Sequence, residues 1–557
     1  MKRSTTKGRG LVILAGVLII AGLLLGACGS SSGGGGGASP SAAGTPKPGG
    51  TYNFVLGSDP YAIDAAQAYE SEGMQVVHQV FQGLVAAAVD DKGNVAVAPG
   101  IAESWETTDN QTWTFHLKKG VMFAAPVSTE VTAQTFIDSW NYVTDEKNGS
   151  FVSYVLAPID GMAASGYSAD AKKGLTGLSA PDPYTLVVKL QYPFADFAVS
   201  LLHPVSSALP VDYIKEIGYK AFAAKPVGTG PYMVTKWVHK QYVDLVKNPD
   251  YWDKANAGYM DNIHMPIIVS SQTSWLEFQK GDVDYTHVPP GQIRASKTNP
   301  NVTSGEWTAK GWPYITTDYV AFNMNDKVVG GSQGLELRKA MYMSTDAQAI
   351  LNIVYEGEAV PATGIVPQGM PGWRPDVSPY KTNDDAGAKA ALTAYGKTPP
   401  TLNYWYNTDE SNQKTAEVLQ AGWKNIGINV TLSNFEWTTF LDKTSKGEGQ
   451  VYRSGWVADY PSYDNFLYPL FQSEQPSGNN STFYKNPEFD ALLTKARATS
   501  DATARYDVYA EAEKMLLTDA AVIPTVYPRA FRVTNNRIAG FSQDPIGFIN
   551  MWQLWVK

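Results

Sequence analysis

The stretch Arg453-Ser454-Gly455-Trp456-Val457-Ala458-Asp459-Tyr460-Pro461 brings one cation, one carboxylate and two aromatic rings within a few residues of one another. Glycine, tryptophan and valine predict a strand, and Asp459 with Pro461 predicts where that strand ends. A strand end of this composition suits a zwitterionic ligand. The pattern is also typical of an ordinary turn beside a surface arginine, because Asp is a common turn residue. The rest of the chain has to decide between the two interpretations.

Length and composition indicate a large globular protein. The 557 residues are 44% hydrophobic, 12% aromatic and 17% charged, and this length favours two or more lobes over a single core. The formal net charge is -9, and it becomes -13 without the four basic residues among the first nine positions. Nucleic acid and anionic membrane surfaces are therefore not expected as partners, because binding them needs concentrated Lys and Arg.

The first 50 residues are typical of an exported lipoprotein. A basic start precedes the apolar run Leu11–Gly26, which is short for a membrane span and typical of a signal-peptide core. Leu25-Gly26-Ala27-Cys28 resembles the bacterial lipoprotein signal, in which the cysteine is lipidated; the alternative is a cysteine buried in a membrane helix. We expect a signal peptide at 1–27 and a flexible Gly/Ser/Ala/Pro tether at 28–50. The folded part is then extracytoplasmic, anchored to the cell membrane by a lipid on Cys28.

Hydrophobic periodicity predicts a mixed α/β fold after residue 50. Apolar residues alternate in the expected strands and recur at three- and four-residue spacing in the expected helices. The expected strands are 52–56, 102–106, 112–123, 185–190, 233–237, 319–323, 428–432 and 522–533. The expected helices are 73–85, one that begins at Thr132, 335–354, 411–426 with Ser411 as its cap, 487–497 and 502–517. Because helix 411–426 leads directly into a strand while hairpins occur elsewhere, the sheets should not be purely parallel.

Catalytic motifs are nearly absent from the sequence. The six histidines are scattered without metal-ligand spacing, and the single cysteine allows neither an intrachain disulfide nor a thiolate metal cluster. The Gly-x-Ser-x-Gly match at 29–33 lies in the tether, where no strand-turn-helix elbow can hold its serine. Gly228-Thr229-Gly230 lacks the third glycine of a dinucleotide loop. We therefore expect no enzyme activity, no metal and no cofactor.

Aromatic residues are the other signal. The chain has 15 Trp and 31 Tyr, more than packing usually requires, and a cluster such as Tyr404-Trp405-Tyr406 can line a cleft. Most Trp and Tyr residues of a large α/β protein belong to the core or its rim, so a packing role stays open for each of them.

Seven short blocks occur in the same order as in one family of proteins. They are Ala102–Glu106 with Leu117–Phe123, Pro226–Tyr232, Asn248–Trp252, Gly281–Asp284, Leu337–Ala340 with Asp346, Trp456–Tyr460, and Asn486–Asp490. Together they resemble the oligopeptide- and dipeptide-binding members, family 5, of the extracytoplasmic solute-binding proteins of ABC transporters. The resemblance runs from Thr51 to the C-terminus. It implies an α/β fold like that of type II periplasmic binding proteins, with mixed sheets, an extra subdomain and two lobes joined by a hinge.

The lobe boundaries and the ligand contacts follow from the same resemblance. Lobe I would comprise 51–317 and the returning segment 528–557, and lobe II would comprise 318–527. In peptide-binding members an aspartate at the position of Asp459 pairs with the α-ammonium of the ligand, and Arg453 matches a basic position near the carboxylate end. The expected ligand-binding set is Asp459, Arg453, Gly455, Trp456, Val457, Tyr460, Trp405, Tyr69, Glu70 and Ser71. Within it, strand residues around Gly455 would bond the peptide main chain as an added strand does.

The sequence thus predicts a monomeric, membrane-tethered subunit of an ABC importer that captures short peptides between its lobes and delivers them to the permease. Three alternatives stay open: an oligosaccharide-binding protein of the same family, a surface receptor for a peptide signal, and a secreted hydrolase. Asp459 distinguishes peptides from sugars, because sugars offer no ammonium. A hydrolase needs a nucleophile-base pair or a metal cluster, and the sequence supplies neither.

Overall fold

A computed structural model of the chain describes residues 45–90, 95–475 and 479–557. The predicted signal peptide, Cys28 and most of the predicted tether lie outside the described residues. Within the described part of the chain, no helix combines the length and the apolar character that crossing a membrane requires.

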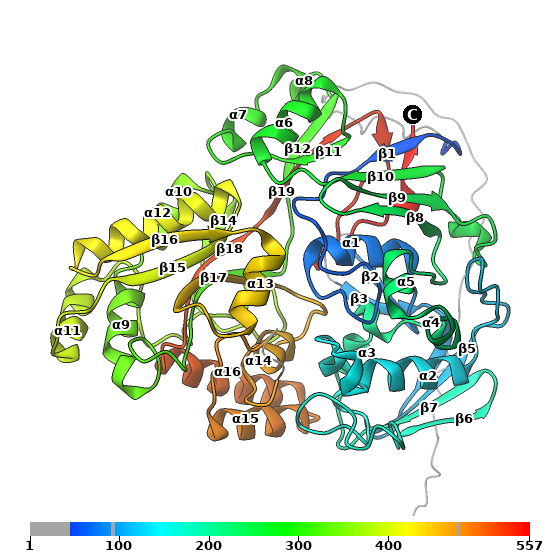
Figure 1. The fold of residues 1–557 in the computed structure, drawn as a ribbon, viewed down its shortest axis with the longest axis horizontal. Helices are drawn as coiled ribbons and strands as arrows, with labels where there is room; N and C mark the ends of the chain where they lie inside the picture. Colours follow the sequence, from blue (N-terminus) through cyan, green and yellow to red (C-terminus); the bar gives the residue numbers. More distant parts are fainter. Residues whose placement is uncertain (1–44, 91–94, 476–478) are drawn as a thin grey trace, which may run out of the picture. The chain divides into compact units, whose positions relative to one another are not determined.

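One mixed sheet, with the helices around it, is called the second lobe below, and the other described elements are called the first lobe. Among the described residues this sheet has six strands in the order β14-β18-β13-β17-β15-β16. The bounds are β13 (Thr316–Phe322), β14 (Ala359–Pro361), β15 (Leu402–Asn407), β16 (Val430–Phe435), β17 (Val451–Val457) and β18 (Val522–Pro528). Strand β15 runs parallel to β16 and β17, whereas β13 is antiparallel to both of its neighbours. Strand β18, from near the C-terminus, lies between β13 and β14 in this order, and Figure 1 shows it beside β14. The prediction of sheets that are not purely parallel is confirmed.

The first lobe contains several smaller sheets. In the described residues their orders are β1-β10-β9-β8, β4-β5-β7-β6, β2-β3, β11-β19-β12 and β20-β21. The bounds are β1 (Thr51–Asn53), β2 (Val85–Val89), β3 (Val95–Pro99), β4 (Ala102–Glu106), β5 (Thr112–Leu117), β6 (Leu178–Asp182), β7 (Thr185–Lys189), β8 (Tyr232–Val238), β9 (Tyr242–Lys247), β10 (Asn262–Pro266), β11 (Tyr285–His287), β12 (Trp307–Trp312), β19 (Ala530–Asn535), β20 (Ile538–Ala539) and β21 (Trp555–Val556).

Helices accompany both sets of sheets (Figure 1). In the first lobe they are α1 (Ser71–Val80), α2 (Ala133–Thr144), α3 (Phe197–Ser200), α4 (Val211–Ile217), α5 (Tyr219–Ala224), α6 (Ser271–Lys280), α7 (Ile293–Ser296) and α8 (Pro300–Thr303). In the second lobe they are α9 (Leu335–Met343), α10 (Ala347–Ile353), α11 (Asp385–Tyr395), α12 (Glu410–Asn425), α13 (Trp437–Ser445), α14 (Asp464–Phe471), α15 (Pro487–Arg497) and α16 (Ala502–Thr518).

Local capping decides several helix boundaries. Asp409, not Ser411, caps α12, since its carboxylate accepts the Asn412 N–H at 2.9 Å. The single helix predicted at 335–354 is wrong. The structure has α9 and α10 there, because Asp346 accepts the Ala349 N–H at 2.8 Å and so begins a new helix. The helix predicted at 73–85 is also shifted. The structure has α1 there, which begins at Ser71 and ends at Val80 because the next residue, Phe81, is extended.

The predicted strand 522–533 is two strands in different sheets. Strand β18 ends at Pro528, which has no N–H to offer a neighbouring strand, and β19 begins at Ala530 in the sheet with β11 and β12. A second short link joins Trp312 of β12 to Thr316 of β13. The six-stranded sheet is therefore connected to the β11-β19-β12 sheet at two adjacent places.

Candidate functional site

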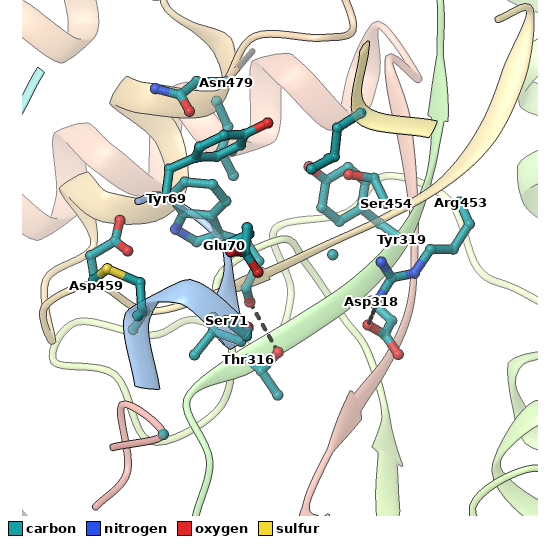
Figure 2. Close-up of a pocket in the computed structure, with 18 of the residues that line it drawn as sticks. Tyr69, Glu70, Ser71, Thr316, Asp318, Tyr319, Arg453, Ser454, Asp459 and Asn479 are labelled. Atoms are coloured by element: carbon teal, nitrogen blue, oxygen red, sulfur yellow. Dashed lines mark hydrogen bonds and ion pairs between the residues drawn. The ribbon is translucent and has the colours of Figure 1, made fainter. Parts of the chain in front are cut away.

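A cavity lies where the end of β17 and the start of β13 face the N-terminus of α1. It is lined from both lobes, and its wall includes Tyr69, Glu70, Ser71, Thr316, Asp318, Arg453, Gly455, Trp456, Val457 and Asp459. Eight of the ten predicted ligand-binding residues are therefore brought together around one space. Figure 2 shows Asp459 and Arg453 on opposite sides of it, with the segment from Tyr69 to Ser71 between them.

The other two predicted residues are not in this wall. The Trp405 side chain is buried against Phe435, with ring centroids 4.8 Å apart. Tyr460 is also buried, and its hydroxyl donates to Asp464 Oδ2 at 3.3 Å. Both side chains belong to the packing of the second lobe in this structure.

Asp459 is held at one end of the cavity by contacts from both lobes. Its Oδ2 accepts hydrogen bonds from the Tyr154 hydroxyl and from Asn465 Nδ2, the latter at 3.0 Å. The Asp459 N–H donates to Asn465 Oδ1 at 2.9 Å. Burial, with the neighbouring Asp459 carboxylate, raises the pKa of Tyr154 well above its usual value, so the hydroxyl stays a donor. One carboxylate oxygen is thus fixed in place.

The second oxygen of Asp459 faces an imidazole. Asp459 Oδ1 lies 3.7 Å from Nε2 of the fully buried His203. Because His203 Nδ1 accepts the Val205 N–H at 3.0 Å, the neutral ring carries its proton on Nε2. Burial lowers the pKa of His203, although Asp459 opposes that shift. The imidazole is therefore neutral, and Oδ1 has acceptor capacity left for an incoming cation.

Arg453 occupies the other side of the cavity as half of an ion pair. Its Nη2 lies 3.5 Å from Asp318 Oδ1, and the Tyr355 hydroxyl donates to Asp318 Oδ2 at 2.5 Å. Burial opposes the charged guanidinium, but Asp318, followed by Tyr355 and Asp409, keeps the pKa of Arg453 above its usual value. Gly455 lies against this pair, and a Cβ there would be 2.8 Å from Asp318 Oδ1. A side chain at 455 would push the pair apart.

Strand β17 offers a backbone edge to the cavity. On one side it pairs with β13 along its whole length, from Val451 to Val457. On the other side β15 pairs only with Val451 and Tyr452. From Arg453 to Val457, no strand of the described residues occupies that second edge. Its N–H and C=O groups are available to an extended ligand.

The segment from Tyr69 to Ser71 in the cavity wall also forms the N-terminal cap of α1. Glu70 is buried, and its carboxylate accepts the N–H groups of Gly73, Glu72 and Tyr61 at 2.8, 2.9 and 3.1 Å. Burial raises the pKa of Glu70, and the nearby Glu72 carboxylate adds to the shift. Glu70 therefore begins α1 and sets where Tyr69 and Ser71 enter the cavity wall.

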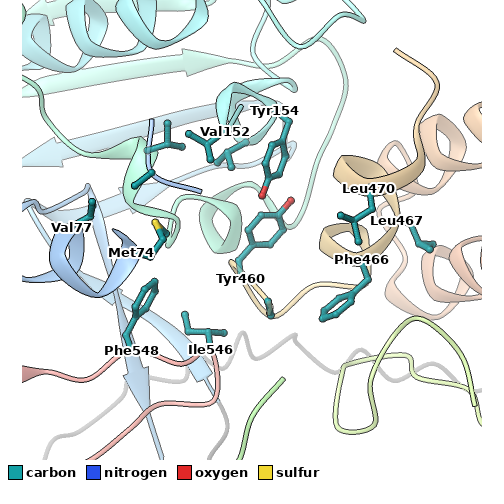
Figure 3. Close-up of a cluster of buried hydrophobic side chains, with 14 of the residues drawn as sticks. Met74, Val77, Val152, Tyr154, Tyr460, Phe466, Leu467, Leu470, Ile546 and Phe548 are labelled. Carbon is teal, nitrogen blue, oxygen red and sulfur yellow. The ribbon is translucent and has the colours of Figure 1, made fainter. Parts of the chain in front are cut away.

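Apolar side chains from both lobes pack near the Asp459 end. Figure 3 shows Met74 and Val77 of α1 and the rings of Tyr154, Tyr460 and Phe548, with side chains of α14 beyond them. These buried groups keep water from the carboxylate, whose side chain is 12% exposed. A charge pair formed there is less screened than one at the surface.

Sequence reasoning missed the groups that hold Asp459. Tyr154 and His203 are far from it in the chain, and no pattern in the sequence joins them. Asn465 follows six residues later, but nothing in its neighbours indicates that it bonds back to Asp459. Asp318, the partner of Arg453, was also missed. Among the described residues, no group of three His, Cys, Asp or Glu side chains is placed to hold a metal ion.

Comparison with known sequences identifies a family that matches most of this chain. The profile of the bacterial extracellular solute-binding proteins, family 5, matches residues 96–478. The periplasmic oligopeptide-binding protein OppA of Salmonella typhimurium is 31% identical over 522 residues, which is 90% of this chain and 91% of that protein.

Solved structures of relatives have the same two-lobed fold. Escherichia coli MppA, a murein tripeptide-binding protein, superposes with a TM-score of 0.81 at 27% identity, over 92% of this chain and 98% of that one. Haemophilus influenzae OppA in complex with the peptide RPPGFSPFR gives 0.80 at 25% identity, over 91% and 98%. An unliganded open form of MppA gives only 0.60 at 26% identity, over 91% and 97%. The lobes of this chain are thus placed differently from those of that open form. By sequence and by fold, the chain belongs to the bacterial extracellular solute-binding proteins of family 5.

Proposed function

We propose that this protein captures short peptides between its two lobes as the substrate-binding subunit of an ABC importer. The observation that carries the proposal is the carboxylate of Asp459, which lies at one end of a cavity lined by both lobes. Its Oδ2 is fixed by donors, and its Oδ1 keeps capacity for the α-ammonium of a peptide. An ammonium removed from water must be paired in this way.

The backbone edge of β17 supports a peptide over other ligands. An extended peptide beside residues 453–457 would form the main-chain hydrogen bonds of an added strand. Such bonds are indifferent to side chains. The site would therefore select for a free N-terminus and an extended backbone, with Arg453 further along the cleft.

The remaining assignments belong to the same proposal. The first lobe comprises 51–317 with the returning 528–557, and the second comprises 318–527. A lipid on Cys28 anchors the protein to the cell membrane through the segment 28–50, and the monomer delivers its peptide to a permease without chemical conversion. The family of solute-binding proteins and the periplasmic location in the names of relatives such as OppA support this role.

Calorimetric titration of the full-length chain, purified in detergent, tests the proposal. The probes are trialanine, N-acetyl-trialanine and maltotriose. Binding of trialanine that acetylation abolishes is the expected result, because the acetyl group removes the ammonium that Asp459 pairs with. Binding of maltotriose alone would overturn the peptide assignment in favour of an oligosaccharide-binding protein.

A further inference from the structure

A second cavity continues from the first on the side away from Asp459. The two share the wall residues Ser71, Gln75, Tyr314, Trp437, Arg453 and Gly547. The second cavity is also lined by Glu72, His287, Asp409 and Arg532, which come from α1, β11, the start of α12 and β19. A ligand whose ammonium is at Asp459 can therefore pass Arg453 and continue into a chamber with its own charged groups.

The two arginines of this cleft differ in their partners. Arg453 has Asp318 at 3.5 Å. Arg532 forms no ion pair with any carboxylate of the described residues. One of its nitrogens, Nη1, donates to the carbonyl of Phe531 at 3.1 Å, while its buried Nε has no hydrogen-bond partner among those residues. Arg532 is thus a cation at the cavity wall with donors to spare.

None of the other described titratable groups in the chamber wall forms an ion pair with Arg532. His287 is neutral, because burial and the adjacent Arg532 lower its pKa well below the usual value. Tyr285 remains protonated, because its burial raises its pKa although Arg532 opposes the shift. Asp409 accepts the first N–H groups of α12, and Glu72 lies beside the Glu70 carboxylate; burial raises the pKa of both Asp409 and Glu72. Of the two arginines in the described wall of the second chamber, Arg532 is therefore the one without an ion pair, while the carboxyl groups of Asp409 and Glu72 lie in the same wall and are occupied by contacts at the starts of α12 and α1.

We infer that Arg532 binds a carboxylate of the captured peptide, at the end of the cleft opposite Asp459. The inference rests on the proposed function and adds to it a preference for ligand length. A guanidinium with free donors recognises a carboxylate through charge-assisted hydrogen bonds. The carboxylate comes from the C-terminus of a peptide long enough to reach the second chamber, or from an acidic side chain placed there. Arg453, already paired with Asp318, contributes less to the carboxylate.

The test measures the cost of amidating the C-terminus. Alanine peptides of two to six residues are titrated as free acids and as C-terminal amides into the full-length chain. At the length whose end reaches Arg532, amidation is expected to weaken binding by at least about tenfold, the size of one or two hydrogen bonds to a charged group. In Arg532→Gln the acid and the amide of that length should bind equally.

Three further variants separate the role of Arg532 from a general loss of affinity or stability. Arg532→Lys keeps the charge and should retain part of the acid-amide difference. Arg453→Gln should retain most of it. Arg294→Gln, whose residue is exposed on α7 and lines neither cavity, should retain all of it. Because the ratio of acid to amide affinity is taken within one variant, a uniform loss of affinity or stability does not affect it.

The outcomes distinguish the inference from the function on which it rests. If peptides bind but amidation has no effect at any length, or its effect survives in Arg532→Gln, the inference is overturned and the function stands. If no peptide binds, both are overturned. An amide that regains affinity when its last residue is Asp, and loses that gain in Arg532→Gln, identifies a side chain as the source of the carboxylate.

Discussion

Asp459 gives the most direct prediction at the scale of a single residue. Replacement by Asn keeps the shape but removes the charge that pairs with the peptide ammonium, a loss of about 3 to 5 kcal/mol for a buried pair. Asp459→Asn should therefore weaken trialanine binding by at least about a hundredfold with little change in the melting temperature. Asp212→Asn is the control, because that side chain is 98% exposed. Unchanged affinity in Asp459→Asn would place the ammonium elsewhere.

A second prediction concerns the ion pair that packs α14 against α15. Arg497 donates from Nε and Nη2 to the two carboxylate oxygens of Asp464 at 2.8 and 2.7 Å, and both side chains are almost fully buried. Arg497→Met leaves Asp464 charged without its partner. We expect the free energy of unfolding to fall by about 3 to 5 kcal/mol in urea titrations followed by tryptophan fluorescence.

The matched control for this pair is an exposed one. Arg374 Nη2 lies 2.8 Å from Asp507, whose side chain is 64% exposed. Arg374→Met should change the free energy of unfolding by no more than about 1 kcal/mol. Losses of equal size in the two variants would show that burial does not govern the contribution of the Arg497 pair.

The buried carboxyl group of Glu513 should make the free energy of unfolding depend on pH. It is buried in α16, where it accepts the N–H groups of Ile365 and Val366 at 2.7 and 3.0 Å and the hydroxyl of Tyr463. Burial raises its pKa from 4.5 to about 7. Between these values the folded protein holds a proton that the unfolded chain has released. Stability should therefore fall as the pH rises through this window, by up to about 1 kcal/mol per pH unit from this group.

The variant Glu513→Gln isolates that contribution. Asp544 and Asp64 are also buried, and their pKa values of about 7 and about 6 give slopes of the same sign. The variant should therefore flatten the decline between pH 5 and 7 without abolishing it. Urea unfolding at several pH values measures the difference between the two proteins, and parallel curves would refute the assignment of the proton to Glu513.

At the scale of elements, one helix end ties the two lobes together. Glu410, the first residue of α12, accepts the hydroxyls of Ser270 and Ser271 at 2.9 and 2.8 Å and the Ser271 N–H at 3.0 Å, at the start of α6. Glu410 lines neither cavity. Its contacts hold together two helices that belong to different lobes.

Loss of this contact should weaken ligand binding indirectly. In Glu410→Gln the lobes come together less readily, so the affinity for trialanine should fall about three- to tenfold. Small-angle scattering of the unliganded variant should show a larger radius of gyration. Glu417→Gln, an exposed position on the same helix, should leave both quantities unchanged. A lower affinity without any change in scattering would contradict the role in closure.

Individual elements show what the sequence can predict. Helix α15 has the predicted bounds, because Asn486 and Pro487 mark its start and its apolar stripe is regular. The break between α9 and α10 was missed because the apolar pattern continues across it, and only the cap at Asp346 interrupts the helix. Periodicity thus indicates the type of an element more reliably than its ends.

At the scale of the whole molecule, the two sides of the candidate site were predicted by different routes, because Tyr69, Glu70 and Ser71 were placed there by the resemblance to a family and not by a local motif. Gly455, Trp456, Val457 and Asp459 lie on one strand and its end, so a local motif was enough to place them together. Tyr154 and His203 belong to the other lobe and come close to Asp459 only in the folded protein. Arg532 arrives from the last strands of the chain. Contacts of this kind depend on how distant segments pack together, and a local sequence pattern does not predict that packing.

The arrangement of the lobes explains why so many contacts cross between them. The structure superposes better on MppA with a TM-score of 0.81 than on the open form with 0.60. Contacts such as Tyr154 with Asp459, and Ser270 with Glu410, are therefore expected to break when the lobes separate. Opening would free Oδ2 of Asp459 to solvent and would widen both cavities.

The short link between β18 and β19 restricts how this chain can tolerate insertions and deletions. Arg529 alone separates Pro528 of one sheet from Ala530 of another. Successive strand residues point to opposite faces, so one added or deleted residue at 529 would turn every side chain of β19 to the wrong side. Arg532 would then point away from the second cavity, and Val533 would leave the core. Homologous chains should therefore keep the number of residues between Pro528 and Arg532 constant even where the residues themselves vary.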